Sequence, residues 1–151
     1  MIKLSDFLSE DSIQNLYKIN IGDVFLVNLT REEGITPKEG NTRNKFFIVL
    51  GFDDMGNAYG GVIINSHINS NMPVHIQELH MPLHNIKYKF LSHNSFIDCS
   101  KLFIVNKSKL KGELYKGSLT EEDLELAIGT VCESKTINKM LLRRFHISKN
   151  F

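Results

Sequence analysis

The chain has 151 residues, the size of one domain, and its 42% hydrophobic and 23% charged residues exclude a wholly disordered protein. The net charge of +1 is uneven: residues 1–100 carry 8 Lys and Arg against 11 Asp and Glu, and residues 101–151 carry 10 against 6. The basic C-terminal third could attract phosphate, although such residues more often form the solvated face of a helix.

The beginning of the chain and its two cysteines indicate where the protein works. Residues 1–12 lack the apolar run of a signal peptide, and no stretch has the length of a membrane span. Cys99 and Cys132 lie far apart within apolar patterns, which is typical of buried thiols in a reducing compartment. We therefore expect a cytoplasmic protein with no membrane partner.

In chain order, a helix is expected over residues 4–18, and strands follow it. The run 22–29 is apolar on both faces, which predicts a central strand. Residues 30–44 hold glycines, a proline and mixed charges and predict a long loop. Residues 45–52 and 58–65 predict two strands joined by a hairpin turn at 53–57, which contains Gly56 and Asn57. After a polar connection over 66–74, strands are expected within 75–83 and over 95–106.

The C-terminal third changes from strand to helical periodicity. Ser118 and Thr120, followed by acidic residues, offer capping boxes. Apolar side chains then follow at helical spacing: Leu124, Ala127, Ile128 and Val131. A second stripe is expected from Ile137, Met140, Leu141 and Phe145.

These elements predict one domain that is mainly β with C-terminal helices. Five strands joined mostly by short links favour a small barrel or a tightly coiled antiparallel sheet. We divide the domain into an N-terminal helical extension over 1–20, a β-barrel over 21–106 and a C-terminal helical part over 107–151.

The order of two motifs resembles a known family. The strand GDVFLVNL, a glycine-bearing loop and TRNKFFIVLG are followed later by SFIDCSKLFIVNKSKLKGELYKGSLTEEDLELAIGTV. Together they resemble the MazF/PemK (Kid-like) toxins of type II toxin–antitoxin systems over about residues 21–132. The chain departs from the family at Asn44, where members have proline, and at Asn65 or Ser66, where members have threonine or serine.

The resemblance implies a fold, an activity and partners. The fold would be a small SH3-like antiparallel β-barrel of the CcdB/MazF kind that forms a homodimer. The activity would be metal-independent cleavage of single-stranded RNA, with no cofactor. The partners would be the RNA and an antitoxin protein that blocks the RNA groove.

Such cleavage needs a base for the 2′-hydroxyl proton, a cation for the charge that develops at phosphorus, and an acid for the leaving oxygen. Arg43 is the candidate cation, because a guanidinium matches phosphate and remains charged; alternatively, it pairs with an acid such as Glu39. His67 is the candidate for proton transfer, and Ser66 is the third candidate catalytic residue. The alternative for Ser66 and Asn65 is a turn cap, and for His67 an exposed loop position.

Further polar residues near Arg43 are candidate substrate-binding groups: Asn65, Thr42, Asn44, Lys38 and Lys45. A zinc site built from His75, His80 and His84 is disfavoured, because an odd spacing does not place two residues on one face of a strand. Phe25, Phe46, Phe47 and Phe103 are expected in the core rather than as platforms for base stacking.

Two further functions stay open beside the nuclease. One is a catalytically silent SH3-like barrel that binds protein or nucleic acid, which the two departures from the family favour. The other is a topoisomerase poison of the same fold, for which no specific residue speaks.

Overall fold

The computed structural model describes residues 18–35 and 42–149. The expected helix over 4–18 lies almost wholly outside the described residues, as do Lys38 and Glu39. Among the described residues, no helix combines the length and apolar character needed to cross a membrane.

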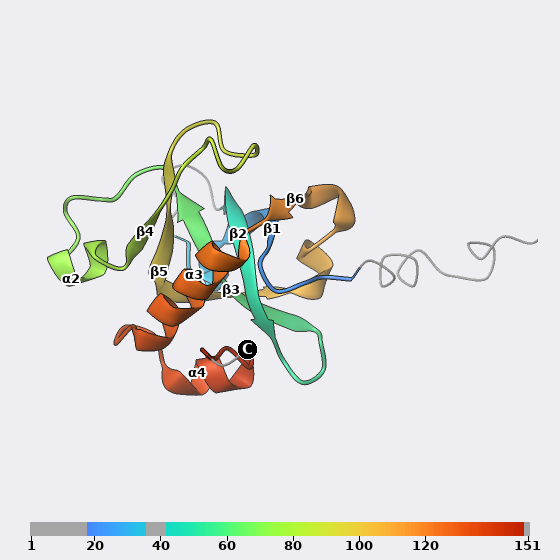
Figure 1. The fold of residues 1–151 in the computed structure, drawn as a ribbon. Coiled ribbons are helices and arrows are strands. Elements are labelled where there is room, and N and C mark those ends of the chain that lie inside the picture. The colour runs from blue at the N-terminus through green and yellow to red at the C-terminus, as the bar shows by residue number, and fades with distance from the viewer. Residues whose placement is uncertain (1–17, 36–41, 150–151) are drawn as a thin grey trace, which may run out of the picture.

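The described residues form one six-stranded antiparallel sheet with a few helices (Figure 1). The strand order is β4-β5-β3-β2-β1-β6. The strands are β1 (Asp23–Thr30), β2 (Thr42–Phe52), β3 (Ala58–Asn65), β4 (His80–Leu83), β5 (Ser95–Asn106) and β6 (Tyr115–Ser118). The helices are α2 (Val74–Gln77), α3 (Glu121–Glu133) and α4 (Lys139–Arg144), with 3-10 turns η2 (Arg31–Glu33), η3 (Lys107–Lys109) and η4 (Gly112–Leu114). The prediction of a mainly β protein with C-terminal helices is confirmed.

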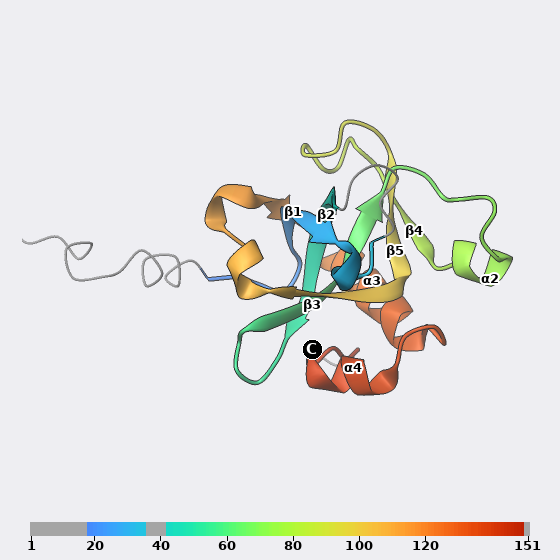
Figure 2. The same ribbon diagram turned by 180° about the vertical axis from the view of Figure 1, so that it is seen from behind.

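The sheet separates two apolar layers, because alternate side chains of each strand point to opposite faces. On the side that we call the helix face, Val24, Ile48 and Val62 pack with Ala127 and Val131 of α3. On the other side, which we call the far face, Phe25, Phe47, Ile63, Phe103 and Val105 form a second buried cluster. Figure 1 shows α3 in front of the sheet, and Figure 2 shows it behind β5.

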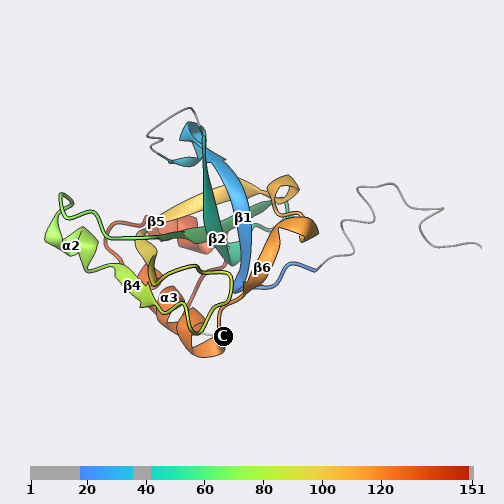
Figure 3. The same ribbon diagram turned by 90° about the horizontal axis from the view of Figure 1, so that it is seen from above.

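The sheet is strongly coiled. The pairing of β2 with β3 shifts register between Val49 and Gly51, and that of β3 with β5 shifts between Gly61 and Ile63. A Cβ on Gly61 would lie 2.0 Å from the carbonyl oxygen of Ile48, so only glycine allows this close approach. Figure 3 shows β1 and β2 running across the direction of β3 and β5. Within the described residues β4 and β6 pair on one side only, so the sheet is coiled but not closed.

The hairpin end of β2 and β3 is packed against the C-terminal residues. Phe145 is fully buried and lies against Gly60, where an added Cβ would meet its ring at 2.9 Å. At Gly51 an added Cβ would lie 2.0 Å from the carbonyl oxygen of Phe145. Two glycines therefore let the segment after α4 pack directly on the sheet.

Four details of the prediction were wrong. Residues 75–79 form α2 and a turn instead of a strand, because Pro73 accepts hydrogen bonds from the amides of Ile76 and Gln77. The part expected to be helical, 107–151, also contributes β6. β1 continues through Thr30 and β2 begins at Thr42, so the loop is shorter than 30–44. Met140 is 72% exposed, and Leu142 is the buried residue of α4.

Candidate functional site

A cavity of about 750 Å³ lies where β2 begins and β3 ends. Five of the predicted site residues line it, namely Arg43, Lys45, Asn65, Ser66 and His67. The polar connection 68–72 forms a wall, and His80 of β4 also lines the cavity. The site therefore combines two neighbouring strands with the loop that leaves the second of them.

Strand alternation explains why the two cations share this cavity. Arg43 pairs with Leu29 and Lys45 with Val27, whose side chains belong to the far-face cluster. Because directly paired residues of antiparallel strands project to the same face, Arg43 and Lys45 continue the far face beyond its apolar part. Both are half-buried.

Asn65 of β3 lies beside the cations of β2. It lies at the end of the strand, and its Oδ1 accepts a hydrogen bond of 2.9 Å from Nζ of Lys45. The side chain of Arg43 makes no hydrogen bond or ion pair within residues 18–35 and 42–149, and the residue lines the cavity. No carboxylate of the described residues lines the cavity, whose lining includes both cations.

Ser66 and His67 form a hydrogen-bonded pair at the cavity rim. The Oγ atom of Ser66 lies 3.0 Å from Nδ1 of His67, and both side chains are exposed. If the serine hydroxyl donates, Nε2 of the imidazole carries the proton and faces other partners as a donor. If Nδ1 carries the proton, Nε2 is an acceptor. Each tautomer supports one direction of proton transfer.

His80 forms a buried part of the cavity wall. Its side chain is 1% exposed, with Nδ1 3.0 Å from the carbonyl oxygen of Ile76 and Nε2 3.7 Å from Asp98. Since a carbonyl can only accept, Nδ1 is the donor in that hydrogen bond. The sequence suggests His80 only as a disfavoured zinc ligand. Its place in the same cavity as Arg43 depends on the pairing of β4 with β5, which has no local signal in the sequence. No cluster of three or more potential metal ligands occurs in the described part of the chain.

Thr42 and Asn44 lie apart from the cationic cavity. They alternate with Arg43 and Lys45, and both accept hydrogen bonds from Nδ2 of Asn28, at 3.1 and 2.9 Å. Asn44 lines a second, smaller cavity on the helix face. Of the four phenylalanines expected in the core, Phe25, Phe47 and Phe103 are buried, whereas Phe46 is half-buried and lines this second cavity.

The loop that carries part of the wall of the second cavity is hydrogen-bonded to α3. Asp123 in the first turn of α3 accepts hydrogen bonds from the hydroxyl of Tyr88 and, at 3.0 Å, from Nζ of Lys87. Burial raises the pKa of the Asp123 carboxyl, but these donors outweigh burial and hold the pKa below its ordinary value. Burial and the bond to Asp123 raise the pKa of Tyr88 in turn.

Comparisons with known proteins do not assign the chain to a family. No protein-family model matches the chain, and no curated protein is significantly similar to it.

Proposed function

We propose that this protein is a metal-independent endoribonuclease of the MazF/PemK kind, which cleaves single-stranded RNA and is held inactive by a cognate antitoxin. One observation carries the proposal: Arg43, Lys45, Asn65, Ser66 and His67, which come from two strands and a loop, line one cavity that contains no carboxylate of the described residues. Two cations beside a serine–histidine pair suit a phosphodiester.

In the proposed reaction the 2′-hydroxyl of a ribose attacks the adjacent phosphorus. The bond from phosphorus to the 5′-oxygen breaks, which gives a 2′,3′-cyclic phosphate and a free 5′-hydroxyl. The charge that develops on the phosphoryl oxygens is stabilised by Arg43, with Lys45 as a second cation. His67 takes the proton of the 2′-hydroxyl and gives a proton to the leaving 5′-oxygen, and Ser66 fixes the imidazole ring or binds the phosphate.

We also propose the SH3-like barrel arrangement and the homodimer that the family resemblance implies. The strongly coiled sheet with α3 on one face supports the fold assignment. The positive charges of Arg43 and Lys45 suit an acidic segment of an antitoxin as well as RNA, because both would neutralise the same cations.

The test is cleavage of a long single-stranded RNA in the presence of EDTA. The variants are Arg43→Ala, His67→Ala and Ser66→Ala, with Arg31→Ala as the matched control, because Arg31 is exposed on η2 and does not line the cavity. We expect discrete fragments from wild type and Arg31→Ala, and none from Arg43→Ala. Intact RNA with folded wild-type protein would instead support a binding module without catalysis.

A further inference from the structure

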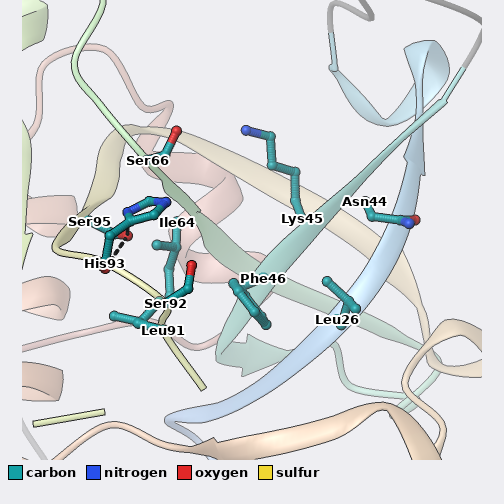
Figure 4. A pocket seen from close by; sticks show the side chains of 10 residues that line it. All are labelled: Leu26, Asn44, Lys45, Phe46, Ile64, Ser66, Leu91, Ser92, His93 and Ser95. Carbon is teal, nitrogen blue, oxygen red and sulfur yellow. Dashed lines mark hydrogen bonds between the residues drawn. The ribbon is translucent and has the colours of Figure 1, made fainter. Parts of the chain in front are cut away.

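The second cavity lies beside the proposed phosphate site, and the two cavities share Lys45 and Ser66 in their walls. It has a volume of about 170 Å³ and lies on the helix face, between the start of β2 and the loop that precedes β5. Figure 4 shows Lys45 and Phe46 pointing to opposite sides of β2. Because Lys45 and Ser66 belong to both walls, a strand of RNA whose phosphate lay on Arg43 and Lys45 could reach this cavity with an adjacent base.

The lining of the cavity combines one aromatic ring with aliphatic side chains. Phe46 is half-buried and packs at 5.2 Å, centroid to centroid, against Phe90, which fixes its ring. Leu26, Ile64 and Leu91 complete the apolar part. The volume is well below the roughly 300–1,000 Å³ of pockets for drug-sized ligands, so the cavity suits one small planar ring.

The rim carries hydrogen-bonding groups that are not used within the described residues. Oδ1 of Asn44 accepts from Asn28, which leaves its amide NH₂ as a donor. Nδ1 of His93 lies 3.0 Å from the carbonyl oxygen of Asn94 and 3.4 Å from Oγ of Ser95. In the tautomer whose Nδ1 donates to the carbonyl, Nε2 is an acceptor. Ser92 is exposed, and its hydroxyl makes no hydrogen bond inside the described ranges.

Hydrogen bonds within the protein hold this wall. Oδ1 of Asn94 accepts a 2.9 Å hydrogen bond from the amide of Asn85, which closes the loop that carries Ser92 and His93. Tyr88 in the same loop is bound to Asp123 of α3. A site that needs little ordering retains more of its contact energy for binding.

We propose that this cavity binds one nucleobase of a single-stranded RNA, stacked on Phe46 and hydrogen-bonded to Asn44, Ser92 and His93. The proposal deepens the proposed function, on which it rests for the position of the neighbouring phosphate at Arg43 and Lys45. Aromatic stacking holds any base, whereas donors and acceptors at the rim select among bases. The cavity therefore sets the base preference at one position next to the scissile phosphate.

The test separates binding from cleavage. Short single-stranded homopolymers of uridine, cytidine and adenosine, with 2′-O-methyl sugars that cannot attack phosphorus, are titrated with the full chain by fluorescence anisotropy. Phe46→Leu keeps an apolar side chain and removes the ring; we expect affinity for the preferred homopolymer to fall about five-fold or more. Phe52→Leu is the control, because Phe52 is an exposed ring of the same strand outside both cavities.

Exposed rim residues keep the test valid if Phe46→Leu folds poorly. Ser92→Ala and Asn44→Ala should each reduce the difference in affinity between homopolymers by about 3- to 10-fold. Arg43→Ala should weaken all homopolymers alike and leave their ranking unchanged.

The outcomes distinguish the base site from the nuclease. A base preference that is lost in Phe46→Leu and Ser92→Ala supports the base site, even if long RNA stays intact in the cleavage assay. Suppose that wild type cleaves RNA, and that Phe46→Leu, Ser92→Ala and Asn44→Ala bind the homopolymers with unchanged affinity and ranking. This result overturns the base site and still supports the nuclease. Failure of wild type to bind any homopolymer also overturns the base site.

Discussion

The two ends of the β2–β3 pair differ in how they are covered: one is packed against other residues, and the other borders a cavity. At the hairpin end, Gly51 and Gly60 admit the ring and backbone of Phe145, and the contact is fully buried. At the other end the same strands present Arg43, Lys45 and Asn65 around an open polar cavity. We expect the hairpin end, where glycines allow close packing, to contribute most to stability. The candidate chemistry lies at the other end, where polar side chains line a cavity.

The largest effect on stability is expected at the packed end. Phe145→Ala should lower the free energy of unfolding by about 3–5 kcal/mol, because a fully buried aromatic ring is replaced by a cavity. Denaturant titration measures the change. Met140→Ala, which truncates an exposed side chain of the neighbouring helix, is the control and should change stability by less than about 0.5 kcal/mol. Equal effects of the two variants would show that the contact with the glycines contributes little.

The open end should behave in the opposite way. Arg43→Ala should reduce the rate of RNA cleavage about 10²- to 10³-fold, as expected when one group that stabilises transition-state charge is removed. Its free energy of unfolding should remain within about 0.5 kcal/mol of wild type, because the side chain makes no ion pair within the described residues. Cleavage rates and thermal denaturation of one preparation test both parts. A large loss of stability would mean that Arg43 is structural.

The contact between Tyr88, Lys87 and Asp123 should contribute less to stability than Phe145 and more than Arg43. Its contribution should also depend on pH. The folded-state pKa of Asp123 lies below its unfolded value near 3.8, so its stabilising effect is complete above that value and is lost as the pH falls through the folded pKa. Asp123→Asn should cost about 1.5–3 kcal/mol at neutral pH, the range of hydrogen bonds to a charged group. The difference from wild type should shrink on acidification below about pH 4.

Urea titrations of both proteins at neutral and acidic pH measure this shrinkage. The variant Glu122→Gln, an exposed neighbour in the same turn of α3, controls for the general loss of a negative charge near the helix N-terminus. A difference between Asp123→Asn and wild type that stayed constant with pH would rule out the carboxylate as the source.

The smallest effect is expected away from both ends. Gly129 lies within α3, and beyond its chain neighbours and the backbone of its own helix an added Cβ would meet no atom within 4 Å. Gly129→Ala should therefore raise the free energy of unfolding by about 0.5–1 kcal/mol through helix propensity alone. The same substitution at Gly61 should be strongly destabilising, because its Cβ would collide with the backbone of Ile48. The pair tests whether the close approaches in the sheet, and not glycine as such, hold the fold.

Local patterns were sufficient to predict much of the fold. The bounds 58–65 and 95–106 agree with β3 and β5, because long apolar runs flanked by turn residues leave little choice of structure. α3 follows from Thr120, which caps the helix, and from its apolar stripe. β6 was missed because its four residues have no apolar alternation, and its strand state depends on pairing with β1.

Local patterns likewise predict only part of the candidate site. The hairpin of β2 and β3 brings Arg43 and Lys45 close to Asn65, and the sequence predicted both strands. The contributions of His80 and of the loop with Ser92 and His93 depend on β5 lying beside β3 and on β4 lying beside β5, an order that no local signal specifies. Phe46 was expected in the core because an apolar run does not show which residue of a strand remains partly uncovered.

The pairing of β1 with β6 has a consequence for protein synthesis. Ser118 in β6 donates a hydrogen bond to Asp23 at the start of β1, a separation of 95 residues. At about 5–20 residues per second, a ribosome needs about 5–20 s to add that length. During this interval the edge of β1 that pairs with β6 in the folded protein, at residues 23–25, lacks that partner. We expect a chaperone that binds extended apolar segments to act on the nascent protein before β6 emerges.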